Sequence, residues 1–192
     1  MQLDSKEAWL EGVRRCPSPH CDERPCDSEI NLLVIHGISL PPGEFGGPFI
    51  DQLFTGCLDK NAHPQFIDIA HLCVSSHLLI RRTGEIIQYV SLQQRAWHAG
   101  ISNFADRTHC NDFSIGIELE GCDNIPYTDE QYQQLAQVIQ ILQQAWPALT
   151  TERMVGHSDI APGRKTDPGP AFNWNSLYAL INKHSDSNVS CR

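Results

Sequence analysis

The stretch Leu32-Leu33-Val34-Ile35-His36 is the part of the sequence that decides the fold. Its four consecutive apolar residues, followed by the chain-breaking run Pro41-Pro42-Gly43, are typical of a short buried strand. A histidine at the end of such a strand is usually a structural residue with its own hydrogen bonds. His36 becomes a candidate ligand only if other ligating side chains converge on it, so the rest of the sequence has to supply them.

Further periodic segments surround this strand. Segments 74–80 and 85–90 predict a hairpin, and residues 114–119 predict another strand in which apolar and polar positions alternate. Residues 128–146 predict the clearest helix, because a capping box opens it, apolar residues recur on one face and Pro147 ends it. The remaining expected segments are helices at 4–13, 48–54 and 173–183 and a long irregular segment at 55–72.

Strands interleaved with helices in this order predict an α/β fold, with α+β-like layers built on a single central sheet. At 192 residues the chain is long enough for one domain with a sizeable core, and short for two. We therefore expect a single domain over residues 1–192, with its core at 9–183 and a polar tail at 184–192.

Composition and charge exclude several classes of partner. The net charge of −9, with Arg doublets only at 14–15 and 81–82, argues against nucleic acid. No apolar run reaches the ~18 residues of a membrane-spanning helix. Residues 1–13 lack the apolar core of a secretory signal. We therefore expect a cytoplasmic protein without nucleic-acid or membrane partners, and we expect it to be a monomer.

The eight cysteines are scattered along the chain, without the density of a disulfide scaffold. Free thiols are the expected state in a protein without an export signal. Cys16, His20, Cys21 and Cys26 are close enough in sequence to form a structural metal site. Their C-x4-C-x4-C spacing differs from the paired C-x2-C of zinc ribbons, so this local site stands as an alternative.

The run HSDIAPGRKTDPGP at 157–170 supplies side chains that could converge on His36. His157 and Asp167 lie in one loop stiffened by proline and glycine, and with His36 they form an N,N,O donor set that suits Zn²⁺. Three protein ligands leave one tetrahedral position for water, as in catalytic zinc sites. The sequence alone leaves five other histidines as rival ligands, namely His63, His71, His77, His98 and His109.

Further residues have the chemistry of an active site. Strand alternation places Glu118 and Glu120 on one face, and a carboxylate near a metal and a lysine can accept a proton. Lys165 could stabilise an oxyanion beside the metal. Trp97 and His98 offer an aromatic face and a polar donor to a substrate. Each has a plainer alternative, namely a solvated strand face, an exposed loop lysine and a core aromatic residue.

Four long motifs resemble the zinc N-acetylmuramoyl-L-alanine amidase family, which includes bacteriophage amidases and peptidoglycan-recognition proteins. They are HGISLPPGEFGG at 36–47, RAWHAG at 95–100, CNDFSIGIELEG at 110–121 and the run at 157–170. The resemblance implies a mixed β-sheet flanked by helices. It also implies one Zn²⁺ per chain, bound by His36, His157 and Asp167.

The resemblance further implies that Glu118 is the general base, that Lys165 stabilises the oxyanion and that Trp97 lines the substrate groove. The implied reaction is hydrolysis of the amide between 1,6-anhydro-N-acetylmuramic acid and L-alanine in recycled muropeptides. Two alternatives remain open. One is a peptidoglycan-binding module that has lost its metal, and the other is a zinc amidase that acts on intact cell wall outside the cytoplasm.

Three substrate-facing positions depart from the family pattern. Gly37 stands where asparagine is usual after the first ligand, and Cys73 and His109 stand where arginine is expected. Arginine would bind stem-peptide carboxylates through two hydrogen bonds. These departures therefore concern substrate affinity and stem preference, and they leave the hydrolytic chemistry intact.

Overall fold

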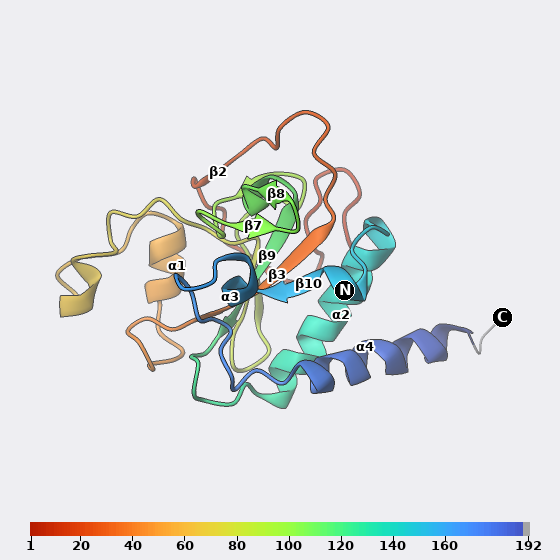
Figure 1. Ribbon diagram of the computed structural model, residues 1–192. Coiled ribbons are helices and arrows are strands. Elements are labelled where there is room, and N and C mark those ends of the chain that lie inside the picture. Colours follow the sequence, from red (N-terminus) through yellow and green to blue (C-terminus); the bar gives the residue numbers. More distant parts are fainter. Residues whose placement is uncertain (190–192) are drawn as a thin grey trace.

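A six-stranded mixed β-sheet forms the centre of the molecule (Figure 1). The computed structural model describes residues 1–189, and the side chains of residues 1–183. The strands lie in the order β1-β5-β4-β9-β3-β10, and every neighbouring pair is parallel except β5 with β4. Their bounds are β1 (Arg14–Arg15), β3 (Leu32–Ile38), β4 (Leu78–Ile80), β5 (Ile86–Gln88), β9 (Ser114–Glu120) and β10 (Met154–Gly156).

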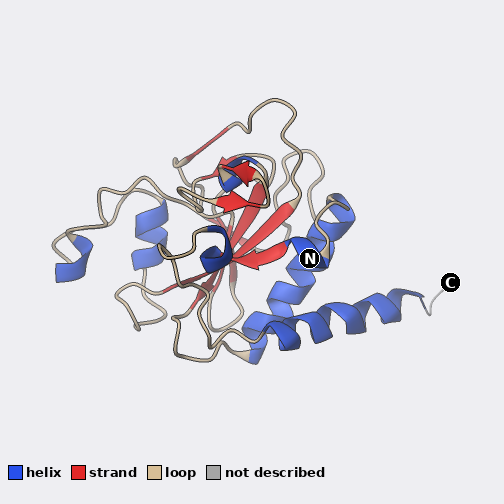
Figure 2. Cartoon of the chain, viewed as in Figure 1, coloured by secondary structure: helices blue, strands red, loops and turns tan. Residues whose placement is uncertain are grey.

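Helices lie on both sides of this sheet, with α2 and α4 on one side and α1 on the other (Figure 2). Short strands pair outside the main sheet, β2 with β6 and β7 with β8. The helices are α1 (Phe49–Phe54), α2 (Asp129–Ala145), α3 (His157–Ile160) and α4 (Trp174–Val189), with 3₁₀ turns η1 (Pro64–Phe66), η2 (Cys110–Asp112) and η3 (Thr151–Arg153). The short strands are β2 (Cys21–Asp22), β6 (Arg95–Ala96), β7 (Asn103–Phe104) and β8 (Arg107–Thr108). This architecture confirms the predicted mixed sheet flanked by helices.

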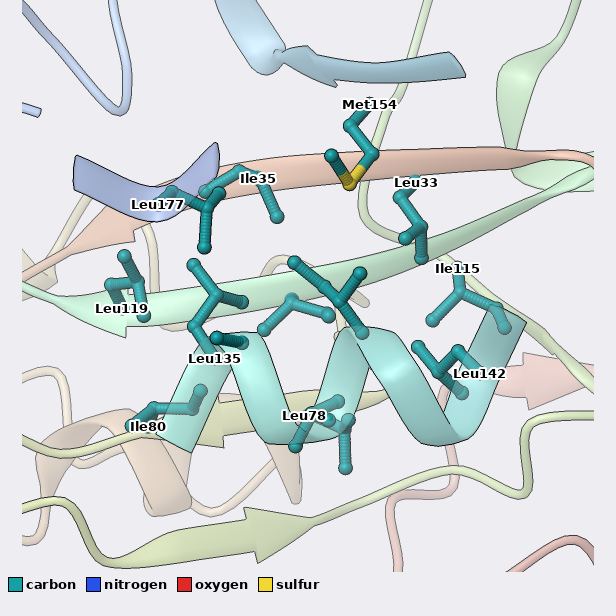
Figure 3. Close-up of a cluster of buried hydrophobic side chains, with 14 of the residues drawn as sticks. Leu33, Ile35, Leu78, Ile80, Ile115, Leu119, Leu135, Leu142, Met154 and Leu177 are labelled. Carbon is teal, nitrogen blue, oxygen red and sulfur yellow. The ribbon is translucent and has the colours of Figure 1, made fainter. Parts of the chain in front are cut away.

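The main core fills the space between the sheet and helices α2 and α4 (Figure 3). Because side chains alternate along a strand, Leu33 and Ile35 of β3 point to this side, together with Ile117 and Leu119 of β9. The apolar stripe of α2, which includes Leu135, packs on them. This packing fixes the register of the sheet, since a one-residue slip would send these side chains to the wrong face.

The opposite face of the same strands carries the polar side chains that matter for function. Leu32 and Val34 pack there in a separate small cluster, and His36 follows them on the same face. Glu118 lies beside His36 because the two residues are register partners in the parallel β3–β9 pair. The alternation predicted for residues 114–119 is therefore confirmed, and it separates the core from the candidate site.

Several predicted elements are confirmed closely. Helix α2 begins after Thr128, whose hydroxyl accepts from the backbone N–H of Gln131 while the Gln131 side chain accepts from the Thr128 N–H. The hairpin predicted at 74–90 is present as the antiparallel pair β4–β5, with shorter strands than expected. Residues 55–72 form the predicted long irregular segment, interrupted only by the short turn η1.

The helix predicted at 4–13 is wrong. This segment folds back on itself, with a bridge between Leu3 and Leu10, and Ala8 (φ 54°) and Gly12 (φ 78°) are left-handed. The Asp4 carboxylate accepts from the backbone N–H of Lys6, so it caps a turn and no helix follows. Tertiary contact overrides local propensity here, because the N–H of Leu10 donates to the buried side chain of Gln88.

At the other end, α4 continues to Val189, beyond the end expected near Lys183, and residues 190–192 of the predicted polar tail lie outside the described residues. Leu177 and Ile181 are buried as expected, and Trp174 and Tyr178 pack partly buried against the same core. Within residues 1–189, no helix combines the length and the apolar character needed to cross a membrane.

Candidate metal centre and active site

Three adjacent parallel strands deliver the polar side chains of the site. Strand β3 lies between β9 and β10, so His36 has Glu118 on one side. On the other side β10 ends at Gly156, which pairs with Ile35, and His157 therefore follows next to His36. The positions of Glu118 and His157 beside His36 could not be predicted from spacing along the chain, because strand pairing brings the three residues together.

His36, His157 and Asp167 converge on one point. The Nδ1 atoms of the two imidazoles are 2.9 Å apart, and the Asp167 Oδ2 lies 3.2 Å from His36 Nδ1 and 3.1 Å from His157 Nδ1. Both histidines are buried. Among the described side chains, these three form the one group of at least three His, Cys, Asp or Glu residues able to share a metal ion.

Two hydrogen bonds hold the loop that carries Asp167. The backbone N–H of Ser158 donates to the Asp167 carbonyl at 3.0 Å, and the Tyr127 hydroxyl donates to the Pro168 carbonyl at 2.9 Å. Gly37 makes room for this second contact, since an added Cβ there would overlap the Tyr127 hydroxyl. The loop is therefore tied both to helix α3, which begins at His157, and to the segment before α2 that carries Tyr127.

The protonation of the two histidines suits a metal ion. His157 Nε2 lies 3.2 Å from the Ala99 carbonyl, which can only accept, so the proton sits on Nε2 and Nδ1 keeps a lone pair. Burial lowers the pKa of His36 to about 4, so its imidazole is neutral at pH 7. Two neutral imidazoles and a carboxylate facing one point form a donor set that fits a divalent cation.

Glu118 completes the polar cluster. Its Oε1 lies 4.0 Å from His36 Nδ1, whereas its Oε2 is buried and has no hydrogen-bond partner. Burial raises the pKa of Glu118 well above its ordinary value; the charge of Asp167 adds to this, and Lys165 opposes it. A buried carboxylate with a raised pKa beside a metal-binding cluster is suited to accept and return a proton.

The cluster opens into two adjoining hollows. One, of about 250 Å³, is lined on its apolar side by residues such as Leu72 and contains Trp97, Glu118 and Lys165 on its polar side. The other, of about 430 Å³, extends from Lys165 and Asp167 toward Cys122–Asn124 and Arg164. Leu72 belongs to the irregular segment 55–72, so part of that segment lines the site. Lys165 is exposed and lies where the two hollows meet.

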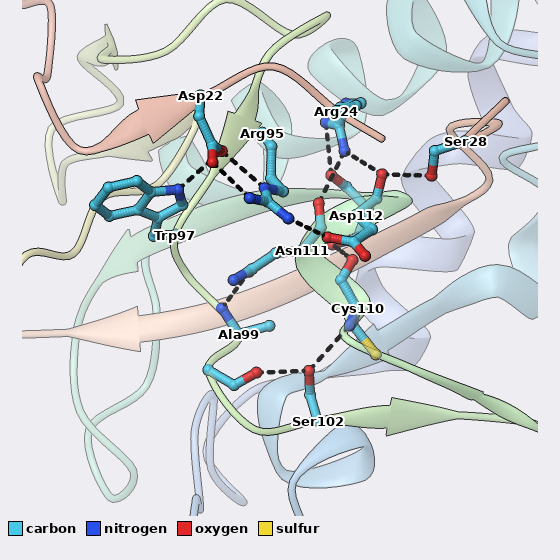
Figure 4. A network of polar contacts seen from close by, with 12 residues as sticks. Asp22, Arg24, Ser28, Arg95, Trp97, Ala99, Ser102, Cys110, Asn111 and Asp112 are labelled. Carbon is cyan, nitrogen blue, oxygen red and sulfur yellow. Dashed lines mark hydrogen bonds and ion pairs between the residues drawn. The ribbon is translucent and has the colours of Figure 1, made fainter. Parts of the chain in front are cut away.

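A polar network that the sequence did not reveal supports Trp97 (Figure 4). The indole N–H of Trp97 donates to Asp22 Oδ1 at 3.0 Å, and Arg95 forms ion pairs with Asp22 at 2.5 Å and with Asp112 at 2.6 Å. The hydrogen bonds from Arg95 hold the pKa of Asp22 below its ordinary value. Asp22 carries no sequence signal, because it comes from β2, more than 70 residues before Trp97.

The rival histidines lie outside the cluster of ligands. His77 is buried, and its Nδ1 accepts from the Gly116 N–H while its Nε2 faces the Gln94 carbonyl, which makes it a core histidine. His98 lines the smaller hollow, but both of its ring nitrogens have protein partners, His36 and Ser114. The remaining rivals take no part, since His63 caps the turn η1 and His71 and His109 are exposed.

The alternative site at Cys16, His20, Cys21 and Cys26 does not assemble as a group of metal ligands. His20 instead stacks on the Trp97 ring at 6.1 Å. All seven cysteines from Cys16 to Cys122 are free thiols, as predicted, and Cys191 lies outside the described residues.

The three positions that depart from the family pattern divide into two groups. Gly37 lines both hollows, directly after the ligand His36. Cys73 and His109 are exposed, and neither lines the hollows described above. Contact between substrate and Cys73 or His109 therefore stays a prediction.

Comparison with known proteins agrees with this geometry. A family model described as N-acetylmuramoyl-L-alanine amidase matches residues 27–170. The chain belongs to this amidase family. The amidase is 60% identical to the 1,6-anhydro-N-acetylmuramyl-L-alanine amidase AmpD of Escherichia coli K12 over 180 residues, which cover 94% of the chain and 98% of that protein. It is 59% identical to AmpD of Citrobacter freundii over 190 residues, covering 99% of the chain and 100% of that protein.

Solved structures match the amidase in the same way. The crystal structure of a selenomethionine AmpD derivative has a TM-score of 0.91 and 61% identity, covering 94% of the chain and 99% of that structure. AmpDh3 from Pseudomonas aeruginosa, solved in complex with anhydromuramic pentapeptide, has a TM-score of 0.58 and 28% identity. That match covers 94% of the chain and 66% of AmpDh3.

Proposed function

We propose that this amidase uses one zinc ion per chain to hydrolyse the amide between the lactyl group of 1,6-anhydro-N-acetylmuramic acid and L-alanine. The observation that carries the proposal is the convergence of His36, His157 and Asp167 beside Glu118 at the base of an open hollow. Full-length relatives that share about 60% of the sequence are named for this reaction, which supports the same substrate here.

Zinc is the metal that the donor set favours. Two borderline imidazole nitrogens and one carboxylate oxygen form a donor set that zinc accepts, and three protein ligands are the number found in catalytic zinc sites. When bound, zinc supplies a Lewis acid that polarises a carbonyl and lowers the pKa of a coordinated water toward ~7. Side chains of the protein itself transfer the proton and help to stabilise the oxyanion.

Glu118 is placed to move the proton. We assign it as the base that takes a proton from the attacking water as the new C–O bond forms at the amide carbon. Lys165, at the junction of the two hollows, stabilises the oxyanion of the tetrahedral intermediate. Glu118 then returns the proton to the alanine nitrogen, the C–N bond breaks, and the products are a carboxylic acid and a free amine.

The hollows offer different chemistry to the two ends of the substrate. Trp97, held by Asp22 and stacked on His20, presents an aromatic face to the apolar side of a sugar ring or a peptide stem. Around the larger hollow, Arg164 and Lys165 add positive charge suited to the carboxylates of a stem peptide. Trp97 and His98 are therefore the wall of the substrate groove in this proposal.

Mass spectrometry of purified anhydro-muropeptide incubated with the zinc-loaded protein tests the proposal. We expect free 1,6-anhydro-N-acetylmuramic acid (or its disaccharide) and the intact stem peptide, with turnover lost in chelator and restored by zinc. Polymeric cell wall serves as the comparison substrate and should be cleaved much more slowly. Tight muropeptide binding without cleavage by the metal-loaded protein would instead identify a binding module. Preferential cleavage of polymer would identify a cell-wall amidase, and it would also contradict the predicted cytoplasmic location.

A further inference from the structure

His98 lies between the candidate metal ligands and strand β9. Its Nδ1 is 2.9 Å from His36 Nε2, and its Nε2 is 3.0 Å from the hydroxyl of Ser114. The ring can lie this close to β9 only because residue 116 is glycine, since an added Cβ would meet His98 Cγ at 2.5 Å. His98 therefore connects the back of a ligand imidazole to the interior of the sheet.

His36, His98, Ser114 and Cys110 form a series of hydrogen bonds. The direction of each bond in the series follows from the contact at Cys110. The Ser114 hydroxyl lies 2.6 Å from the Cys110 carbonyl, and a carbonyl can only accept, so the serine proton points there. Ser114 Oγ must then accept from His98 Nε2–H. A neutral imidazole has one N–H, so His98 Nδ1 is an acceptor and His36 Nε2 must donate to it. His36 Nδ1 is left without a proton, facing His157 and Asp167.

We propose that His98 is a positioning residue that, through Ser114, fixes His36 in the Nε2–H tautomer and so prepares His36 Nδ1 to bind a metal ion. The inference rests on the metal site of the proposed function. Ser114 contacts neither a metal ligand nor the substrate, yet in this proposal it determines which nitrogen of His36 carries the proton. Partners behind a ligand histidine commonly have this effect, and their loss typically lowers metal affinity about 10–100-fold.

The same short segment also fixes the second ligand. The side-chain oxygen of Asn111 accepts from the backbone N–H of His98 at 3.1 Å and of Ala99 at 2.8 Å, and the contact to Ala99 is visible in Figure 4. Ala99 in turn presents its carbonyl to His157 Nε2. One anchored segment thus sets the tautomers of both imidazoles, His36 through a side chain and His157 through the backbone.

The substitution Ser114→Ala tests the hydrogen bonds from Ser114 through His98 to His36 without changing a metal ligand. It removes the acceptor of His98 Nε2–H, which allows the His98 proton to move to Nδ1 and leaves His36 to carry its proton on the metal-facing Nδ1. We expect zinc affinity, measured by competition with a chromophoric chelator, to fall about 10–100-fold. Ser76→Ala is the matched control, because Ser76 is equally buried and its hydroxyl donates to the Gly116 carbonyl of the same strand.

A second readout is independent of zinc. Long-range ¹⁵N–¹H correlation spectra of histidine side chains in the metal-free wild-type protein should place the His36 proton on Nε2, and Ser114→Ala should move it toward Nδ1. The inference is overturned if the wild-type proton is on Nδ1, or if Ser114→Ala and Ser76→Ala have the same zinc affinity. If the wild-type protein shows the expected tautomer but binds no zinc, the proposed zinc-dependent function is wrong. The assignment of the His36 tautomer to His98 and Ser114 is then retained.

Discussion

Replacement of Glu118 by glutamine should separate catalysis from metal binding. Gln keeps the size of the side chain but cannot accept the water proton as a carboxylate does. General acid–base transfer contributes about 10²–10⁴-fold to rate. We therefore expect kcat to fall by that factor, which corresponds to about 2.7–5.4 kcal/mol of transition-state stabilisation.

The structure predicts that zinc remains bound in Glu118→Gln. Glu118 Oε1 is 4.0 Å from His36 Nδ1, so the carboxylate stands beside the three candidate ligands and is not one of them. The assay follows release of the stem peptide by chromatography, and elemental analysis gives zinc per chain. Undiminished turnover in Glu118→Gln would refute its role as base, and loss of zinc together with activity would show that Glu118 acts as a ligand.

The same variant should change the stability of the metal-free protein in a defined direction. Burial raises the pKa of Glu118, so its contribution to stability is present below the unfolded pKa of about 4.3 and is lost as pH rises through the folded value. Each pH unit between the two values costs the wild-type fold about 1.4 kcal/mol relative to the variant, whose side-chain amide is neutral at every pH. Glu118→Gln should therefore be the more stable protein at pH 7.

Denaturant unfolding of both metal-free proteins across this pH range measures the difference. The exposed Glu23→Gln is the control, because it removes the same charge from the surface. If the wild-type protein were as stable as Glu118→Gln at every pH, Glu118 would have a partner that pairs its charge. That result would contradict the buried Oε2 without a hydrogen-bond partner.

Three other perturbations have expected outcomes. Lys165→Ala should lower kcat about 10²–10³-fold with zinc content unchanged, as for loss of an oxyanion donor, and an unchanged kcat would exclude Lys165 from the reaction. Arg81→Met breaks the buried ion pair with Glu120 (2.8 Å) and should lower the free energy of unfolding by about 3 kcal/mol; equal stability in a denaturant titration would contradict this. Adding zinc at 100 times its Kd should stabilise the protein by about 2.7 kcal/mol, seen as a higher Tm, and should not stabilise His36→Ala.

The sequence predicted the parts of the fold that depend on local pattern. The capping box at Thr128, the apolar run ending at His36 and the alternation around Glu118 were all sufficient to place their elements. The segment 4–13 has an equally plausible helical pattern, but the contact of Leu10 with Gln88 decides its structure. Strand β10 was missed, because three residues carry too short a pattern to be recognised.

The residues of the site were predicted from the resemblance to the amidase family, and the order of the strands brings them together in the structure. Spacing along the chain left five rival histidines beside His36 and His157 without a means of choosing among them, and the motifs selected these two together with Asp167. Physically, the choice is made by the order β9-β3-β10, which no single segment encodes. The assigned roles of Glu118 and Lys165, the single domain and the cytoplasmic location stay predictions.

The two faces of this sheet explain how the fold tolerates such a site. A cluster of lone pairs around His36, together with a buried carboxylate that lacks one hydrogen-bond partner, destabilises the metal-free protein. Alternation along β3 and β9 confines these groups to one face, while Ile35 and Ile117 on the other face bury against α2. The stabilising core and the destabilising polar site therefore share the same strands without sharing side chains. Substitution at the core can change stability without changing the chemistry, and the chemistry can change without disturbing the core.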